Sequence, residues 1–215
     1  MPNSSIPAVL LLADGTVHHG QAFGAIGTTT GEICFNTGMT GYQEVFTDPS
    51  YFGQILIMNS AHIGNYGVKD GDVESDSVKI NGLIGRNLED QYSRKMANGS
   101  LNEYLKANKV VSIEGVDTRA LVAQIRTKGA MNCIISSEIT DIEVLKKKLA
   151  ETPNMDGLEL ASKVSTSSSY ELGDAGAEVR IAVMDYGVKK NILQCMVDRG
   201  AHVKVFPAKT PLEEV

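Results

Sequence analysis

Residues 179–208, VRIAVMDYGVKKNILQCMVDRGAHVKVFPA, contain two apolar runs separated by a segment with the pattern of a helix. The runs VRIAVMD and AHVKVFP are typical of buried strands. The segment VKKNILQCMVDRG between them predicts a helix that ends at Gly200. Two strands joined through a helix form a βαβ unit, which opens a parallel sheet with helices on its faces. An α/β fold is therefore predicted for this part of the chain.

The segment before this unit, STSSSYELGDAGAE, is small and polar and has no apolar periodicity. Such a composition buries too little surface to order itself, so we expect a linker at 165–178. A parallel sheet of two strands leaves its apolar faces uncovered. Either the residues after the linker pack on the N-terminal part, or the chain is the front part of a longer polypeptide, which we favour. The predicted organisation is an N-terminal domain at 1–164 and an incomplete domain at 179–215.

The N-terminal part mixes strands with helices. Residues 8–24 predict a hairpin, because Asp14-Gly15 suits a turn between two short strands. Ser100 and Asp117 are in position to cap two helices, and Gly129 to end the second. Further segments have the patterns of strands, EICFN, QILIMNS, VVSIEG and MNCIISS, or of a helix, TDIEVLKKKLAE. A mixed α/β domain is predicted from this order.

Charge and composition exclude several classes of partner. The formal net charge is −6, and the densest basic run is only Lys146-Lys147-Lys148, so the electrostatic footprint of a nucleic-acid-binding protein is missing. The N-terminus has no basic region, and its apolar run is too short to span a bilayer. We expect no nucleic-acid or membrane partner and a cytoplasmic protein. Three cysteines without CxxC spacing, Cys34, Cys133 and Cys195, predict reduced, buried thiols.

A long polar connection, NTGMTGYQEVFTDPSY, fills positions 36–51 between two predicted strands. Asp48 can accept hydrogen bonds from backbone amides and Pro49 fixes φ, so Ser50 would be presented on a stiff loop. Two interpretations stay open from these residues alone. The loop holds a polar ligand, or it is an Ω-like surface loop packed by its own aromatic side chains, Tyr42, Phe46, Tyr51 and Phe52.

Short sequence motifs do not identify a catalytic or phosphate-binding site. The chain has no Walker A, GxGxxG, HExxH or GxSxG motif. The glycine of DYGVKKN could place amides at a helix N-terminus for an anion, but an ordinary strand-to-helix turn explains it better. His62 follows a strand in a glycine-rich turn and has no ligand partner at metal spacing, so we expect a hydrogen-bonded turn residue and no metal site. A nucleotide-binding α/β enzyme would need a glycine-rich phosphate turn and is disfavoured.

Several long phrases resemble one family, the small, glutamine-using subunit of carbamoyl-phosphate synthetase. They are FNTGMTGYQEVFTDPSYFGQILIMNSAHIGNYGV, GVDTRALVAQIRTKGAMNCII, MDGLELASKVS and IAVMDYGVKKNILQCMVDRGAHVKVFPA. The resemblance implies an N-terminal domain characteristic of that subunit, which helps it associate with the large subunit. It also implies that residues 179–206 are the first βαβ unit of a class I glutamine amidotransferase domain.

In that family a cysteine nucleophile, with a histidine base and a glutamate, hydrolyses glutamine. The large subunit, which binds ATP and Mg, then converts the ammonia and bicarbonate to carbamoyl phosphate for arginine and pyrimidine synthesis. The resemblance puts those three catalytic residues beyond the last residue of this chain. Cys195 lies within the predicted helix, on its expected apolar face, with no histidine near it in sequence. We therefore assign no catalytic residue here and expect the chain alone to be inactive.

Two positions carry a role over from the resemblance. Ser50 in TDPSY matches the serine with which the N-terminal domain contacts the substrate L-glutamine across the domain interface. Gly38 and Met39 belong to the same signature and are expected near the ammonia path. No cofactor is expected in this chain itself. The alternative to a piece of an amidotransferase subunit is a non-catalytic module that binds the large subunit or another partner.

Overall fold

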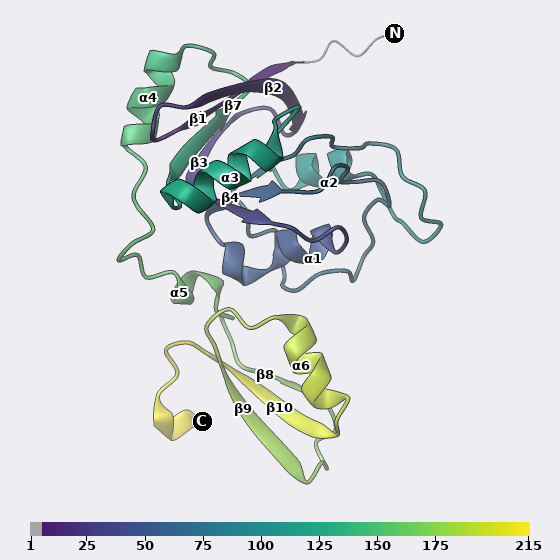
Figure 1. The fold of residues 1–215 in the computed structure, drawn as a ribbon. Coiled ribbons are helices and arrows are strands. Elements are labelled where there is room, and N and C mark those ends of the chain that lie inside the picture. The colour runs from purple at the N-terminus through teal and green to yellow at the C-terminus, as the bar shows by residue number, and fades with distance from the viewer. Residues whose placement is uncertain (1–5) are drawn as a thin grey trace.

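The structure, a computed structural model, describes residues 6–215 and contains two separate sheets (Figure 1). Residues 1–5 of the predicted N-terminal domain lie outside the described part. The first sheet is a closed barrel with the strand order β1-β2-β6-β5-β4-β3-β7. Its strands are β1 (Pro7–Leu12), β2 (Val17–Gly24), β3 (Thr28–Asn36), β4 (Gln54–Met58), β5 (Gly82–Ile84), β6 (Val111–Glu114) and β7 (Asn132–Ser136).

The barrel combines both kinds of strand pairing. β3, β4, β5 and β6 run parallel to their neighbours within this group, whereas the pairs that involve β1, β2 or β7 are antiparallel. Parallel neighbours need long crossover connections, and here these carry most of the polar loops. The coarse prediction of a mixed α/β domain is confirmed.

Apolar side chains of β1 alternate between two buried layers. Leu10 and Leu12 face the interior of the barrel, in a cluster that also contains Ile57 and Ile113. The intervening residues Val9 and Leu11 pack outward against helix α4 (Ile142–Ala150). Because both faces are covered, AVLLL is apolar without a break, as a strand buried on both sides requires.

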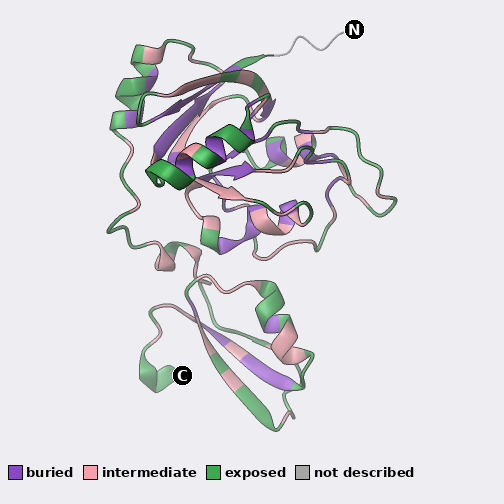
Figure 2. Ribbon diagram, viewed as in Figure 1, coloured by how far each residue is buried: buried purple, intermediate pink, exposed green. Residues whose placement is uncertain are grey.

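Three further helices pack on the barrel. Helix α3 (Thr118–Lys128) adds Leu121, Val122 and Ile125 to the interior cluster. Helices α1 (Tyr42–Thr47) and α2 (Leu101–Ala107) cover another outer face, where they pack on strands β4 and β5. The burial colouring of Figure 2 shows buried residues along barrel strands such as β1 and β7, whereas β2 and β3 are mostly of intermediate burial.

The local signals read from the sequence are confirmed. β1 and β2 form the predicted hairpin, with Gly15 at φ +87° in its turn. The side chain of Ser100 accepts a hydrogen bond from the amide of Glu103, and that of Asp117 from the amide of Ala120. These bonds satisfy amides that the first turn of a helix leaves free.

The second sheet contains the predicted βαβ unit. β9 (Val179–Asp185) and β10 (Ala201–Pro207) pair in parallel, and α6 (Lys190–Val197) connects them. The prediction of an unstructured linker at 165–178 is wrong for Tyr170–Leu172, which forms strand β8 and pairs antiparallel with β10. The backbone of β10 offers partners to any extended segment, whatever its side chains, so a polar stretch is ordered here.

The three cysteines are free, but only Cys133 is buried; Cys34 and Cys195 are half-buried. The expectation of three buried thiols is therefore wrong for two of them. Cys195 also lies off the apolar face of α6, which packs on the sheet through Leu193, Met196 and Val197. Among residues 6–215, no helix combines the length and apolar character needed to cross a bilayer.

Candidate functional site

The connection at 36–51 is partly helical, because it contains α1 and the 3-10 helix η1 (Pro49–Tyr51). Tyr42 and Phe46, one turn apart, are fully buried against the barrel. The Tyr42 hydroxyl donates a hydrogen bond of 2.5 Å to the carbonyl of Gly67. The interpretation of an Ω-like surface loop packed by its own aromatic residues is therefore wrong in one respect: part of the segment is helical, and its Tyr42 and Phe46 rings also anchor it to the barrel.

Asp48 connects α1 to η1, and its carboxylate contacts both Ser50 and the second sheet's part of the chain. Its Oδ1 accepts a hydrogen bond of 2.9 Å from the amide of Ser50. Its Oδ2 lies 2.7 Å from the Nζ of Lys189, which belongs to the turn between β9 and α6. The hydrogen bond that Lys189 donates to the Asp48 carboxylate raises the pKa of Lys189. Ser50 itself is exposed, so its position is fixed through its backbone while its side chain reaches solvent.

The turn at 186–189, which we call the β9–α6 turn, is organised by Asp185. This carboxylate is 6% exposed and accepts three backbone hydrogen bonds, from Gly187 and Val188 at 2.9 Å each and from Thr166 at 2.6 Å. Gly187 has φ +99°, a conformation that favours glycine. A Cβ added to it would lie 3.0 Å from Cβ of Pro49, so the β9–α6 turn and η1 are in close contact.

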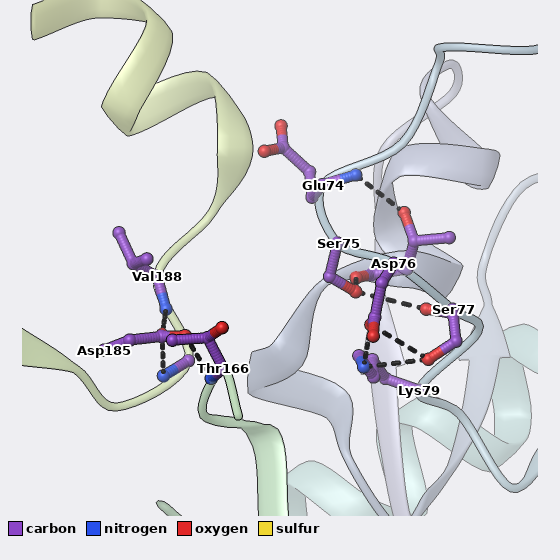
Figure 3. Close-up of polar contacts among 10 residues, drawn as sticks. Glu74, Ser75, Asp76, Ser77, Lys79, Thr166, Asp185 and Val188 are labelled. Carbon is purple, nitrogen blue, oxygen red and sulfur yellow. Dashed lines mark hydrogen bonds and ion pairs between the residues drawn. The ribbon is translucent and has the colours of Figure 1, made fainter. Parts of the chain in front are cut away.

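A loop of the barrel reaches the same place. The amide of Glu74 donates to the hydroxyl of Thr47 at the end of α1, over 2.9 Å, and the Ser75 hydroxyl donates to the Thr47 carbonyl over 2.6 Å. Figure 3 shows the Glu74 carboxylate pointing toward the ribbon of α6. The carbonyl of Glu74 accepts from the amide of Lys190 over 2.9 Å, and its Oε2 accepts from the amide of Asn191 over 3.1 Å.

Between these contacts lies a cavity of about 290 Å³ that both parts of the chain line. On the barrel side, Lys79 is 9% exposed and donates to Asp76 over 2.7 Å and to Ser77 over 2.9 Å (Figure 3). The hydrogen bond from Lys79 lowers the pKa of Asp76. The other side is formed by Thr166, Asp185 and Val188 with neighbouring residues. Charged groups of both signs therefore meet where the barrel faces the second sheet.

The other residues singled out from the sequence lie elsewhere. Gly38 donates its amide to Oδ1 of Asn36, and Met39 is 78% exposed; within the described residues no hydrogen bond or ion pair joins either to positions 165–215. His62 is hydrogen-bonded to Glu89 over 2.9 Å, in agreement with a turn residue. No group of three metal-ligating side chains occurs in the described part of the chain.

The sequence did not indicate Glu74, Asp185 or Lys189 as members of this site. Asp185 and Lys189 lie in the DYGVKKN stretch. Its pattern could have indicated Asp185, because an acidic residue before a glycine turn can accept hydrogen bonds from the amides of that turn. The structure favours the ordinary strand-to-helix turn there. The α6 amides that could have received an anion are instead bonded to Glu74. For Glu74 no local pattern existed, because its partner lies 117 residues further along the chain.

Comparisons with known proteins agree with the sequence phrases. Residues 10–135 match the family described as "Carbamoyl-phosphate synthase small chain, CPSase domain". The carbamoyl phosphate synthase small chain of Synechococcus sp. is 44% identical, with 97% of this chain and 56% of that protein covered. The corresponding protein of Nostoc sp. is 45% identical over 100% of this chain and 60% of its own length. That of Thermosynechococcus vestitus is 46% identical over 97% and 58%.

The chain thus spans between 56% and 60% of the length of these relatives. A solved aminopeptidase from Aneurinibacillus sp. strain AM-1 aligns with 93% of this chain and 48% of its own, at 11% identity and a TM-score of 0.34, which is too low to bear on fold or function. The family match covers more than half of the chain, including the barrel strands from Leu10 to Ile135. On that ground, the chain belongs to the carbamoyl-phosphate synthase small chain family.

Proposed function

We propose that this chain acts as part of the small subunit of a glutamine-dependent carbamoyl-phosphate synthase, and that Ser50 contacts the glutamine substrate. The observation that carries this proposal is the position of Ser50. It lies on η1, whose Pro49 contacts the β9–α6 turn and whose preceding residue, Asp48, is paired with Lys189. The family resemblance implies a substrate contact across the interface of two domains, and the contacts of η1 with the β9–α6 turn support this proposal.

The second sheet fits the start of a class I glutamine amidotransferase domain. We propose the limits 1–164 for the N-terminal domain and 179–215 for the amidotransferase part, with 165–178 joining them and adding β8 to the second sheet. The βαβ unit supports this division, because parallel strands with a crossover helix are the building block of such α/β domains. The ammonia released from glutamine would pass to the large subunit, which binds ATP, Mg and bicarbonate and serves arginine and pyrimidine synthesis.

The residues of this chain would bind and orient glutamine rather than cleave it. The Ser50 hydroxyl can donate or accept a hydrogen bond, and Asp48 fixes the backbone that presents it. Cys195 is half-buried in α6, with Asn191 as its neighbour and no histidine bonded to it, so a base to activate it is missing among the described residues. We therefore propose that the 215-residue chain has no glutaminase activity by itself.

The test is glutamine-dependent synthesis by the complete small chain assembled with its large subunit. Ser50→Ala should raise the KM for glutamine about tenfold, the loss expected for one hydrogen bond to a polar substrate, while ammonia-dependent synthesis stays unchanged. Ser93→Ala, a serine bonded only to the barrel loop at Asn65, serves as the control. An unchanged KM would remove Ser50 from the site. Binding to the large subunit without any glutamine-dependent synthesis would favour the non-catalytic module instead.

We also propose that Gly38 and Met39 lie beside the path of ammonia. Met39 is exposed and Gly38 has little room for a side chain, because an added Cβ would lie 2.9 Å from Oδ1 of Asn36. Gly38→Leu or Met39→Trp in the complete enzyme should uncouple glutamine hydrolysis from carbamoyl phosphate formation. The measurement is the ratio of glutamate to carbamoyl phosphate produced. An unchanged ratio in both variants would end this proposal.

A further inference from the structure

We propose that Glu74 is a positioning residue, which fixes the β9–α6 turn beside Ser50 by acting as the missing cap of helix α6. The kinetic consequence of this proposal rests on the function proposed above, whereas the structural part does not. No residue role carried over from the sequence involves Glu74. It lies in a loop of the barrel that the sequence patterns left without a function.

Helix α6 does not provide its own cap. Lys189 occupies the N-cap position, and its side chain makes no capping hydrogen bond. The first amides of a helix have no partner within the helix, so they need acceptors from elsewhere. Glu74 supplies two of them, its carbonyl to the amide of Lys190 and its Oε2 to the amide of Asn191. A carboxylate is also the charge that the positive end of a helix prefers.

Glu74 is itself held on the barrel. Its amide is bonded to the Thr47 hydroxyl, and the next residue, Ser75, is bonded to the Thr47 carbonyl. Thr47 is 1% exposed and is followed directly by Asp48, which binds the amide of Ser50. Glu74, which supplies the acceptors for α6, and Asp48, which orients Ser50, are thus held at adjacent positions at the end of α1, Glu74 through its bond to Thr47 and Asp48 as the next residue of the chain.

At the start of α6, neighbouring residues bind Glu74 and Asp48. Lys190 and Asn191 bind Glu74, and Lys189 pairs with Asp48. Three consecutive residues at the start of α6 are therefore fixed to the barrel, one through Asp48 after α1 and two through Glu74, whose amide is bonded to Thr47 of α1. Loss of the Glu74 side chain should loosen this connection and let the β9–α6 turn move relative to Ser50. Asp48 would then be the only side chain of this pair left to hold the start of α6, through the partly exposed ammonium group of Lys189.

The first experiment measures amide hydrogen exchange by NMR in the 215-residue protein. In Glu74→Ala the amide of Asn191 should exchange about fivefold faster, the effect of losing one helix cap. The amide of Lys190 should also accelerate, although its acceptor is the backbone of Glu74 and survives the substitution. Glu74→Gln keeps an oxygen acceptor and should stay within about twofold of the unmodified protein. Glu143→Ala, which removes an exposed glutamate paired only with Lys146, is the matched control.

If only the Asn191 amide changes, Glu74 is a cap without a clamping role and the proposal is overturned. If neither amide changes, the contact itself is refuted. Acceleration of both amides, with rescue by Glu74→Gln, supports the structural part of the proposal.

The second experiment uses the complete small chain with its large subunit. Glu74→Ala should raise the KM for glutamine about fivefold, in proportion to the exchange effect, and leave ammonia-dependent synthesis unchanged, while Glu74→Gln restores the KM. An unchanged KM in an enzyme whose unmodified form uses glutamine would refute the positioning role and leave the proposed function standing. An unmodified enzyme that makes no product from glutamine would refute the proposed function and with it the positioning role. The exchange result would still decide whether Glu74 fixes the start of α6.

Discussion

Replacing Tyr42 with alanine should lower the free energy of unfolding of the barrel by about 3–5 kcal/mol, as for other large buried aromatic residues. Tyr42 is fully buried, and its ring stacks on that of Tyr66 at a centroid distance of 4.2 Å. Its hydroxyl satisfies the carbonyl of Gly67. The substitution removes all three contributions and leaves a cavity beneath α1. Urea unfolding followed by far-ultraviolet circular dichroism measures the change.

Two other variants separate these contributions. Tyr42→Phe keeps the ring but leaves the Gly67 carbonyl without its donor, so it should cost about 1–2 kcal/mol. Tyr92→Ala truncates a tyrosine that is 42% exposed and should change stability by less than about 0.5 kcal/mol. A loss below about 1 kcal/mol in Tyr42→Ala would show that α1 contributes little to the core, contrary to the burial of its aromatic face.

Asp185→Ala should destabilise the second sheet by about 3–4 kcal/mol, because one buried carboxylate satisfies three backbone amides there. Without it, the amides of Thr166, Gly187 and Val188 lose their acceptor together. The measurement is hydrogen exchange of the β10 amides, which reports the opening of this sheet separately from the barrel. Faster exchange should be confined to the strands of the second sheet.

Asp185→Asn retains one oxygen acceptor but turns an amide group toward one of its donors, so a smaller loss is expected. Asp198→Ala is the control, because this exposed aspartate accepts only from Gln194 on the surface of α6. Equal acceleration in barrel strands and in β10 would mean that the chain opens as one cooperative unit, and the assignment of Asp185 to a local role would be wrong.

Local structure could be predicted well from the sequence. The hairpin, the caps at Ser100 and Asp117, and the βαβ unit depend on residues close together in the chain, and all of them are present in the structure. Closure of the barrel depends instead on pairing between distant segments. Strand β5 has only three residues, Gly82–Ile84, and pairs on both sides with parallel strands. So short a run carries no periodic signal, and its order comes from its neighbours.

The candidate site divides in the same way. The Asx turn before Ser50 was visible as TDPS, because Asp48 and Ser50 are neighbours in sequence. The helical character of 36–51 was not predicted, since its glycines, threonines and proline favour turns when tertiary packing is ignored. The contacts of Asp48 with Lys189 and of Glu74 with Asn191 join segments more than a hundred residues apart. Nothing in a single sequence specifies such pairs.

The two sheets differ in whether they have free edge strands to which another strand could be added. Every strand of the barrel has a neighbour on each side, so the barrel offers no template for strand addition. β9 is bonded only to β10 among the described residues, and its other edge leaves a row of backbone donors and acceptors. The exposed Arg180 on β9 is the kind of charge that discourages unwanted pairing. At high protein concentration, self-association of this chain by strand pairing should therefore begin at the edges of the second sheet, β9 or the shorter β8, and not at the barrel.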